Sequence, residues 1–444
     1  MFEGHLHTST PSWEKEYQDK LCAPEEAAAL LESNDRVTLT GGNCIPPAFA
    51  TAMSNRAKDL KNVMVSIGYC MDLYGFMDPA NKESFHIETV FVGPVERMCM
   101  DQGVAQYVPV HLGDCSRYAA HANFNRVASV ATPPDENGYM SRSLFGAFLD
   151  NEAIKRADTV IIEVNKNFPR MKSDDFKIHV SEVDCIIENE APLFEIPEIE
   201  ISETEEKIAA HIAEMVDNGS TIQLGFGGLG NAIGNLLVDK KDLGMHSEVI
   251  SPSVMNLMKA GALNGSKKSF LPGKVAGAFC VGTQEFYDFI DENDDFIFYE
   301  IGYLNDPRVI AKNDNLVSIN NALMFDLTGQ AASESIGPKQ YSGTGGQVNF
   351  VHGAKYSKGG KSILALNSTY TNKAGEMKSR ILSLLPLGTA VSTSRNDVEY
   401  VVTEYGVANL RHRSIGDRAR QLIQIAHPDF RDELKHEAKK QGWM

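Results

Sequence analysis

The chain has 444 residues, of which 42 are basic and 59 acidic, so its formal net charge is −17. This charge argues against nucleic acid as a partner, because a phosphate backbone requires a basic protein surface. Hydrophobic residues make up 43% of the chain and charged residues 23%, which is an ordinary globular balance, and the length predicts two or three domains. No apolar run approaches the roughly 18 residues of a membrane span, and residues 1–13 lack the apolar stretch of a secretory signal. We therefore expect a cytoplasmic protein without a membrane partner.

Short apolar strands alternate with helices along the chain, which predicts an α/β fold with largely parallel sheets. Helices are predicted at residues 24–32, 205–217, 231–237 and 417–425, and strands at residues 36–40, 62–67, 159–164, 179–184, 220–224, 382–386 and 400–403.

Residues 188–202 predict a linker, because they are acidic, contain two prolines and lack helical periodicity. Residues 35–43 resemble residues 220–228, since each segment is a strand that breaks into glycines after a helix. We therefore expect an N-terminal extension at 1–12 and two related domains at 13–195 and 196–444.

The seven cysteines are scattered along the chain, odd in number and without a CxxC pair. In a chain without a secretory signal, this pattern predicts reduced thiols that fill small spaces in the core. The seven are Cys22, Cys44, Cys70, Cys99, Cys115, Cys185 and Cys280.

A glycine-rich loop follows the predicted strand 220–224 and precedes the helix 231–237. Its residues are Gly225, Phe226, Gly227, Gly228, Leu229 and Gly230. Glycines let a ligand approach the backbone, and the free amides of a helix start attract an anion, so the loop is a candidate phosphate or oxyanion site. It also matches the dinucleotide-binding pattern, with Glu248 following at about the distance of the ribose-binding acid. An NAD-dependent oxidoreductase therefore remains an open alternative at this point.

Glu248 is predicted at the end of a short strand among apolar and small residues. A buried carboxylate is costly unless it is paired or functional, and strand ends line the ligand crevice of α/β sheets. Desolvation also makes a carboxylate a better nucleophile. A structural, ion-paired acid is the alternative.

A second glycine loop occupies residues 341–349, and its backbone amides could meet a thioester carbonyl, or it could be a plain turn between strands. Lys373 lies in a predicted loop, where it could pair with a ligand phosphate or simply carry surface charge. His246, Glu404 and His427 have no partners at metal-ligand spacing, so no metal site is predicted.

Residues 223–232 and 242–248 resemble the acetyl-CoA hydrolase/transferase family, and within it the 4-hydroxybutyrate and butyryl-CoA:acetate CoA-transferases. Further matching segments are 133–138, 335–348, 393–396, 400–407 and 425–430. The resemblance is looser in the first half. There, residues 41–45 and 66–70 depart from the family pattern, and we expect these segments to help form the acyl pocket.

The resemblance implies two similar open-sheet CoA-transferase-type domains and ping-pong transfer of CoA between a short-chain acyl-CoA and a free carboxylate such as acetate, butyrate or 4-hydroxybutyrate. It implies that Glu248 becomes a glutamyl-CoA thioester, and that no metal or redox cofactor is needed because CoA thioesters are the substrates. The implied CoA or oxyanion contacts are Gly225, Phe226, Gly227, Gly228, Leu229, Asn321, Gly345, Gly346 and Lys373. A homodimer or homotetramer is the implied assembly. A plain acyl-CoA hydrolase and a non-catalytic CoA-binding regulator are the remaining alternatives.

Overall fold

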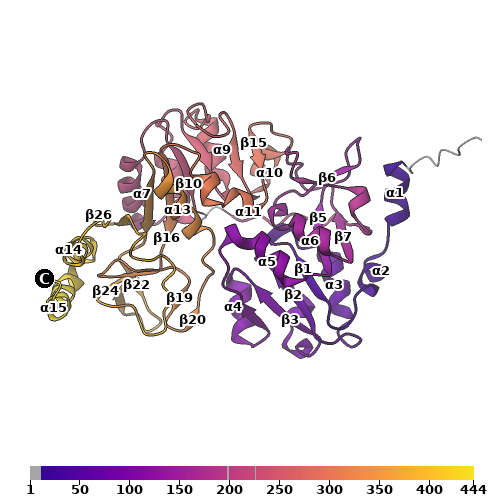
Figure 1. Cartoon of the computed structure of the whole chain (residues 1–444), viewed down its shortest axis with the longest axis horizontal. Helices are drawn as coiled ribbons and strands as arrows, with labels where there is room; N and C mark the ends of the chain where they lie inside the picture. The colour runs from indigo at the N-terminus through magenta and orange to yellow at the C-terminus, as the bar shows by residue number, and fades with distance from the viewer. Residues whose placement is uncertain (1–11, 198–199, 226) are drawn as a thin grey trace, which may run out of the picture.

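The computed structural model describes residues 12–197, 200–225 and 227–444. The chain forms two α/β domains that lie side by side, the first in indigo to magenta and the second in pink, orange and yellow (Figure 1). Each domain is built on one large sheet whose strands are mainly parallel.

The first sheet has seven strands, and all of its strand pairs are parallel. Every residue of its strands β2 and β7 is buried, as expected for parallel strands covered by helices on both faces. In sheet order the strands are β4 (Ala105–Tyr107), β3 (Phe85–Thr89), β2 (Val63–Ile67), β1 (Arg36–Leu39), β5 (Arg126–Ala131), β7 (Thr159–Val164) and β9 (Cys185–Glu188).

The second sheet has eight strands, and only the last strand, β26, is antiparallel to its neighbour among the described pairs. In sheet order they are β15 (Phe296–Phe298), β13 (Val275–Gly277), β11 (Gly244–His246), β10 (Thr221–Leu224), β16 (Leu316–Asn321), β21 (Lys361–Ala365), β25 (Tyr400–Thr403) and β26 (Gly406–Asn409). The short strands form five small sheets: β6 (Tyr139–Ser141) with β8 (Lys177–His179), β12 (Val249–Ile250) with β14 (Phe279–Cys280), β17 (Met324–Asp326) with β18 (Ala331–Ala332) and β24 (Ile381–Leu382), β19 (Ser335–Ile336) with β20 (Lys339–Gln340), and β22 (Thr369–Thr371) with β23 (Met377–Ser379).

The helices of the first domain are α1 (Trp13–Lys20), α2 (Pro24–Ala29), α3 (Pro47–Asn55), α4 (Pro94–Asp101), α5 (Cys115–Ala122) and α6 (Asn151–Arg156). Those of the second are α7 (Glu203–Met215), α8 (Gly228–Leu236), α9 (Pro252–Lys259), α10 (Gln284–Ile290), α11 (Ile301–Leu304), α12 (Pro307–Ile310), α13 (Gln347–Tyr356), α14 (Ile415–Ile425) and α15 (Arg431–Lys440). No helix of the described residues combines the length and hydropathy that crossing a membrane requires.

The two sheets share one strand order. In each, the first strand of the domain is central, with the next three strands on one side and the later ones on the other. The similar segments 35–43 and 220–228 contain β1 and β10, which occupy the same place in their sheets. This confirms the prediction of an α/β fold with two similar, mainly parallel open sheets.

Three local predictions are wrong. Residues 179–184 are not a strand, because β8 ends at His179, whose ring accepts a hydrogen bond from the Ser181 amide and starts a 3-10 turn. The strand predicted at 382–386 is β24, which stops at Leu382 after pairing two residues with β17. Helix α8 begins at Gly228 rather than 231, so part of the first glycine loop is already helical.

The prediction that all cysteines are reduced thiols is also wrong, because Cys22 and Cys185 form a disulfide. A parallel bridge between Leu21 and Ile186 joins the segment after α1 to β9, and the Cys22 amide donates to the Ile186 carbonyl over 2.9 Å. These contacts place the two cysteine Cα atoms 6.4 Å apart, within the range that a disulfide spans. The other five cysteines are free.

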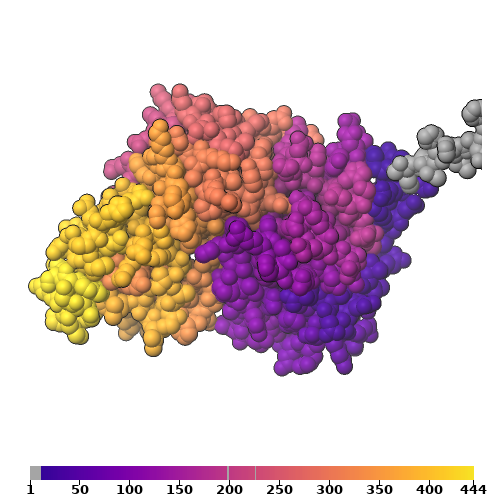
Figure 2. Space-filling model, in the orientation of Figure 1, coloured from indigo at the N-terminus to yellow at the C-terminus, as the bar shows by residue number. Residues whose placement is uncertain are grey.

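The two domains pack tightly against each other along a broad front (Figure 2). One hydrophobic cluster spans both, with Leu144 and Phe145 beside Phe279 and Cys280. The Cys280 amide donates to the Leu144 carbonyl over 2.8 Å, and buried Arg142 forms an ion pair with Glu300 over 3.1 Å. The described part of the connection between β9 and α7 runs across this junction without a helix or strand.

Candidate active site

Glu248 lies between β11 and β12, two residues after β11 ends at the carboxyl edge of the second sheet. Its carbonyl accepts hydrogen bonds from the amides of Ala278 (3.1 Å) and Phe279 (3.0 Å). The neighbouring Ser247 hydroxyl donates to the Leu224 carbonyl over 3.0 Å, at the end of β10. The backbone is therefore held by two adjacent strands, which fixes the direction of the Glu248 side chain.

The Glu248 carboxylate is partly buried and receives two hydrogen bonds. The Asn305 side-chain amide donates to Oε2 over 2.7 Å, and the backbone N–H of Gly346 also donates to the carboxylate. Burial raises the pKa of Glu248 to about 7, against the opposing effect of these two donors. The group is thus poised to change its charge near neutral pH.

A cavity of about 260 Å³ adjoins this carboxylate and is lined by both domains and the segment between them. Glu248 is the one lining residue with a formal charge in the part of the chain that the structure describes. The lining residues are Gly68, Tyr69, Val90, Phe91, Leu112, Phe145, Phe148, Ile196, Glu248, Val249, Phe279 and Val281. A single carboxylate that faces a mainly apolar cavity between domains is a plausible place for a nucleophile.

Residues 41–45 and 66–70, which are expected to help form the acyl pocket, lie at this cavity. Gly68 and Tyr69 line it directly. Gly42 and Cys44 lie behind Phe145: a Cβ atom at Gly42 would overlap the Phe145 ring, and the Phe145 amide donates to the Cys44 sulfur over 3.2 Å. Both segments therefore shape the wall of the cavity that Glu248 lines.

The second glycine loop crosses from the second domain to the first. The Gly345 carbonyl accepts from the Leu112 amide over 3.1 Å, and a Cβ at Gly343 would lie 2.7 Å from the Val90 carbonyl. The loop leads into helix α13 and not into a strand, so the alternative of a turn between strands is wrong. This path brings Gly346 to Glu248, and a Cβ at Gly346 would overlap both Glu248 Oε2 and the Asn305 amide.

The first glycine loop begins directly after Leu224, the residue bonded to Ser247. Gly227 has a φ of 124°, a backbone angle that residues with a side chain rarely adopt. A Cβ atom at Gly228 would lie 2.6 Å from the Glu205 carboxylate. Gly225 and Leu229 flank this turn, whereas Phe226 lies outside the described residues. The loop therefore lies near Glu248 in the fold and needs glycine for both conformation and packing.

The remaining candidates are not brought to Glu248. The Asn321 side chain is exposed at the end of β16, although its carbonyl accepts from Gln347 Nε2 over 2.7 Å at the start of α13. Lys373 is exposed between β22 and β23 and does not line the cavity.

Asn305 is the residue that the sequence prediction missed. It lies between α11 and α12, is fully buried, and shows no motif beyond the turn-forming run 305–307. Its contact with Glu248 depends on how the short helices α11 and α12 pack, and no sequence pattern predicts that packing.

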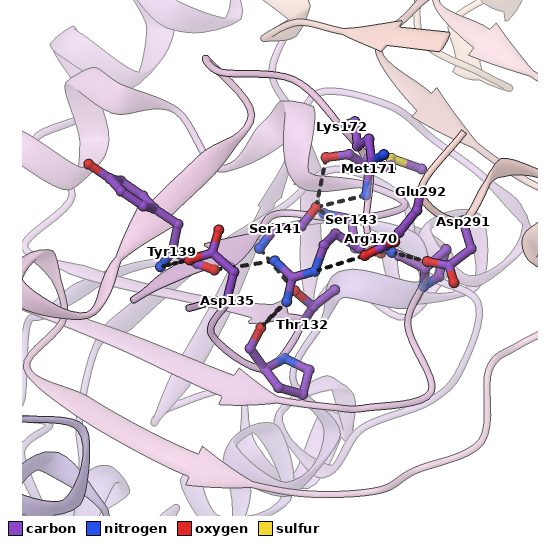
Figure 3. A network of polar contacts seen from close by, with 12 residues as sticks. Thr132, Asp135, Tyr139, Ser141, Ser143, Arg170, Met171, Lys172, Asp291 and Glu292 are labelled. Atoms are coloured by element: carbon purple, nitrogen blue, oxygen red, sulfur yellow. Dashed lines mark hydrogen bonds and ion pairs between the residues drawn. The ribbon is translucent and has the colours of Figure 1, made fainter. Parts of the chain in front are cut away.

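A second cavity, of about 440 Å³, lies where β6 and β8 meet β15 and Lys274, the residue before β13. Arg170 lines this cavity, and its guanidinium donates to the carbonyls of Tyr139 and Pro133. Figure 3 shows the guanidinium facing Glu292. The Arg170 amide donates to Asp291 over 2.7 Å, so this residue joins the domains. The polar groups of Arg170 are already paired, and we assign this cavity no chemistry. Within the described residues, no group of three His, Cys, Asp or Glu side chains could hold a metal ion.

Comparison with known proteins agrees with this geometry. Sequence models of the acetyl-CoA hydrolase/transferase N-terminal and C-terminal domains match residues 7–197 and 282–438. The 4-hydroxybutyrate coenzyme A transferase of Clostridium kluyveri is 41% identical over 96% of this chain and 99% of its own. The succinyl-CoA:cyclohexane-1-carboxylate CoA transferase of Geobacter metallireducens is 40% identical over 97% of both chains.

The crystal structure of RipA from Yersinia pestis superimposes with a TM-score of 0.91 at 33% identity, covering 98% of this chain and 100% of RipA. Glu248 lies between the two matched domain segments, but the full-length relatives span it. The chain therefore belongs to the acetyl-CoA hydrolase/transferase family.

Proposed function

We propose that this enzyme, a CoA-transferase, moves CoA between a short-chain acyl-CoA and a free carboxylate through a thioester on Glu248. The observation that carries the proposal is the Glu248 carboxylate, held by two donors and facing a cavity in which it is the single charged residue among those described. Full-length relatives named as CoA transferases support the transferase class.

The reaction begins when the Glu248 carboxylate attacks the carbonyl of the donor acyl-CoA. The C–S bond breaks, CoA leaves as a thiolate, and an acyl-glutamyl anhydride remains. The thiolate then attacks the glutamyl carbonyl, which releases the free acid and leaves CoA on Glu248 as a thioester. A second carboxylate runs the same steps in reverse, so no net oxidation and no water is required.

Asn305 and Gly346 position the nucleophile in this scheme. Both donate to the carboxylate, so they orient it and remain to stabilise negative charge when the glutamyl carbonyl is attacked. The two glycine loops, with Gly225 to Leu229 on one and Gly345 on the other, offer backbone amides for the CoA arm. Lys373 remains a proposed phosphate contact, because a long basic side chain on a hairpin can reach a nucleotide that lies on the surface.

The test is to incubate the protein with acetyl-CoA, remove free nucleotide and locate the adduct by mass spectrometry before and after borohydride reduction. We expect a CoA mass on the peptide that contains Glu248, and reduction there to the alcohol. Glu248→Ala should carry no adduct and exchange no label between acetate and acetyl-CoA. An active Glu248→Ala protein would refute the mechanism, and release of acid at the same rate without an acceptor carboxylate would indicate a hydrolase.

A further inference from the structure

The cavity beside Glu248 contains no cation among its described lining residues. Apart from Glu248, Tyr69 is the one lining residue with a polar side-chain atom in the part of the chain that the structure describes. Burial raises the pKa of this phenol, so it is neutral at physiological pH. A second carboxylate on a substrate would find no cationic partner here, so the cost of removing it from water would not be offset.

Aromatic rings form one wall of the cavity. The Phe279 ring stacks on Phe145 with centroids 5.0 Å apart and packs at 5.6 Å from Phe148. Phe91 lies edge-on to Tyr69 at 6.0 Å. These flat surfaces come from both domains, and they offer a ring broad apolar contact at favoured aromatic distances.

The cavity is larger than a two-carbon acid needs. Its volume is about 260 Å³, whereas an apolar protein cavity of about 150 Å³ suffices to bind benzene. Among the described residues, neither glycine loop lines it, so a CoA arm that follows those loops leaves this space to the acyl group.

We propose that the acyl pocket selects monocarboxylic acids with a neutral, ring-sized apolar tail, and rejects dicarboxylic acids. The proposal rests on the proposed function, since it assigns the substrate class of the same site. The aromatic wall holds the ring, Glu248 meets the carboxyl carbon, and each methylene buried against the wall adds about four-fold to the binding constant.

The experiment measures kcat/KM for a panel of acceptor acids with acetyl-CoA as donor: acetate (as labelled exchange), butyrate, cyclohexanecarboxylate, phenylacetate and succinate. We expect the two cyclic acids to exceed acetate by about ten-fold or more, from their buried methylenes, and succinate to fall about 100-fold or more below them, because its second charge stays unpaired. Succinate equal to or above the cyclic acids, or cyclic acids below acetate, would overturn the proposal. Transfer to no acid at all would instead overturn the proposed function.

Two variants of Ile196 locate the selectivity. Ile196 is partly buried on the segment between the domains, where its amide donates to the Gly282 carbonyl over 2.9 Å, and its side chain lines the cavity. Ile196→Trp narrows the cavity and should lower kcat/KM for cyclic acids about ten-fold relative to acetate. Leu387→Trp, on a side chain that is 97% exposed, is the matched control and should change kcat/KM neither for the cyclic acids nor for acetate. Ile196→Lys places a cation at the cavity and should raise the ratio of succinate to cyclohexanecarboxylate. An unchanged ratio in both Ile196 variants would show that the acid binds elsewhere and would overturn the assignment.

Discussion

Replacing Glu248 by glutamine separates the energetic cost of burying this carboxylate from its chemistry. Burial raises its pKa from 4.5 to about 7, and a difference of that size corresponds to about 3 kcal/mol. Because the side chain is partly open to the cavity, solvent screening reduces this figure to about 2 kcal/mol.

The sign follows from proton binding. The folded protein holds a proton at Glu248 more tightly than the unfolded chain does. This contribution to stability is therefore fully present below pH 4.5 and is lost as the pH rises through about 7. Glutamine resembles the neutral acid, and its side-chain oxygen can still accept a hydrogen bond from Asn305. The stability of the variant therefore does not fall as the pH rises through about 7. Wild type and variant should unfold with equal free energy near pH 4.5, and the variant should be more stable at pH 8 by about 2 kcal/mol.

Thermal unfolding at both pH values checks this prediction. A gain of about 2 kcal/mol corresponds to roughly 4–8 °C for a domain of this size. Glu83→Gln, on an exposed loop side chain, is the matched control and should show no pH-dependent gap. A Glu248→Gln protein whose melting temperature follows that of wild type at pH 8 would refute the assigned burial cost.

Three further predictions follow from the same contacts. Gly346→Ala should abolish the CoA adduct and lower kcat by about 100-fold or more, because the new Cβ displaces Glu248 and Asn305; a folded, fully active variant, judged by circular dichroism and initial rates, would contradict the geometry. Asn305→Ala should lower kcat about 100-fold with little change in KM for acetyl-CoA, and an effect on KM alone would assign Asn305 to binding instead. Titration of the denatured protein with a thiol reagent should find five thiols without reductant and seven after reduction, and seven in both would exclude the disulfide between Cys22 and Cys185.

Much of the fold could be predicted from the sequence. The strand 159–164 is buried along its whole length and appears as a short, mainly apolar run, and the repeated segments around β1 and β10 are strands that break into glycines. Turns that depend on one side chain were less predictable, as at His179, where a ring nitrogen and not hydrophobic alternation ends the strand.

The site was only partly predictable. Glu248 and Gly346 stand in recognisable segments, but Asn305 reaches Glu248 through the packing of α11 and α12, which lies outside any motif. The Asn321 side chain is exposed and its carbonyl accepts from Gln347 at the start of α13, so its expected contact with CoA or the oxyanion stays a prediction. Pairing Phe145 with Phe279 required knowing how two domains meet.

The shared strand order of the two sheets has a consequence for how such a protein can diversify. The turn after β2, with Gly68 and Tyr69, and the turn after β11, with Glu248, occupy equivalent positions in their sheets and face the same cavity. In the second domain this position holds the proposed nucleophile, Glu248, and in the first domain it holds Gly68 and Tyr69, which line the cavity. A substitution in the first half of the chain, at Gly68 or Tyr69, can therefore alter the fit of the acid without altering the carboxylate that reacts.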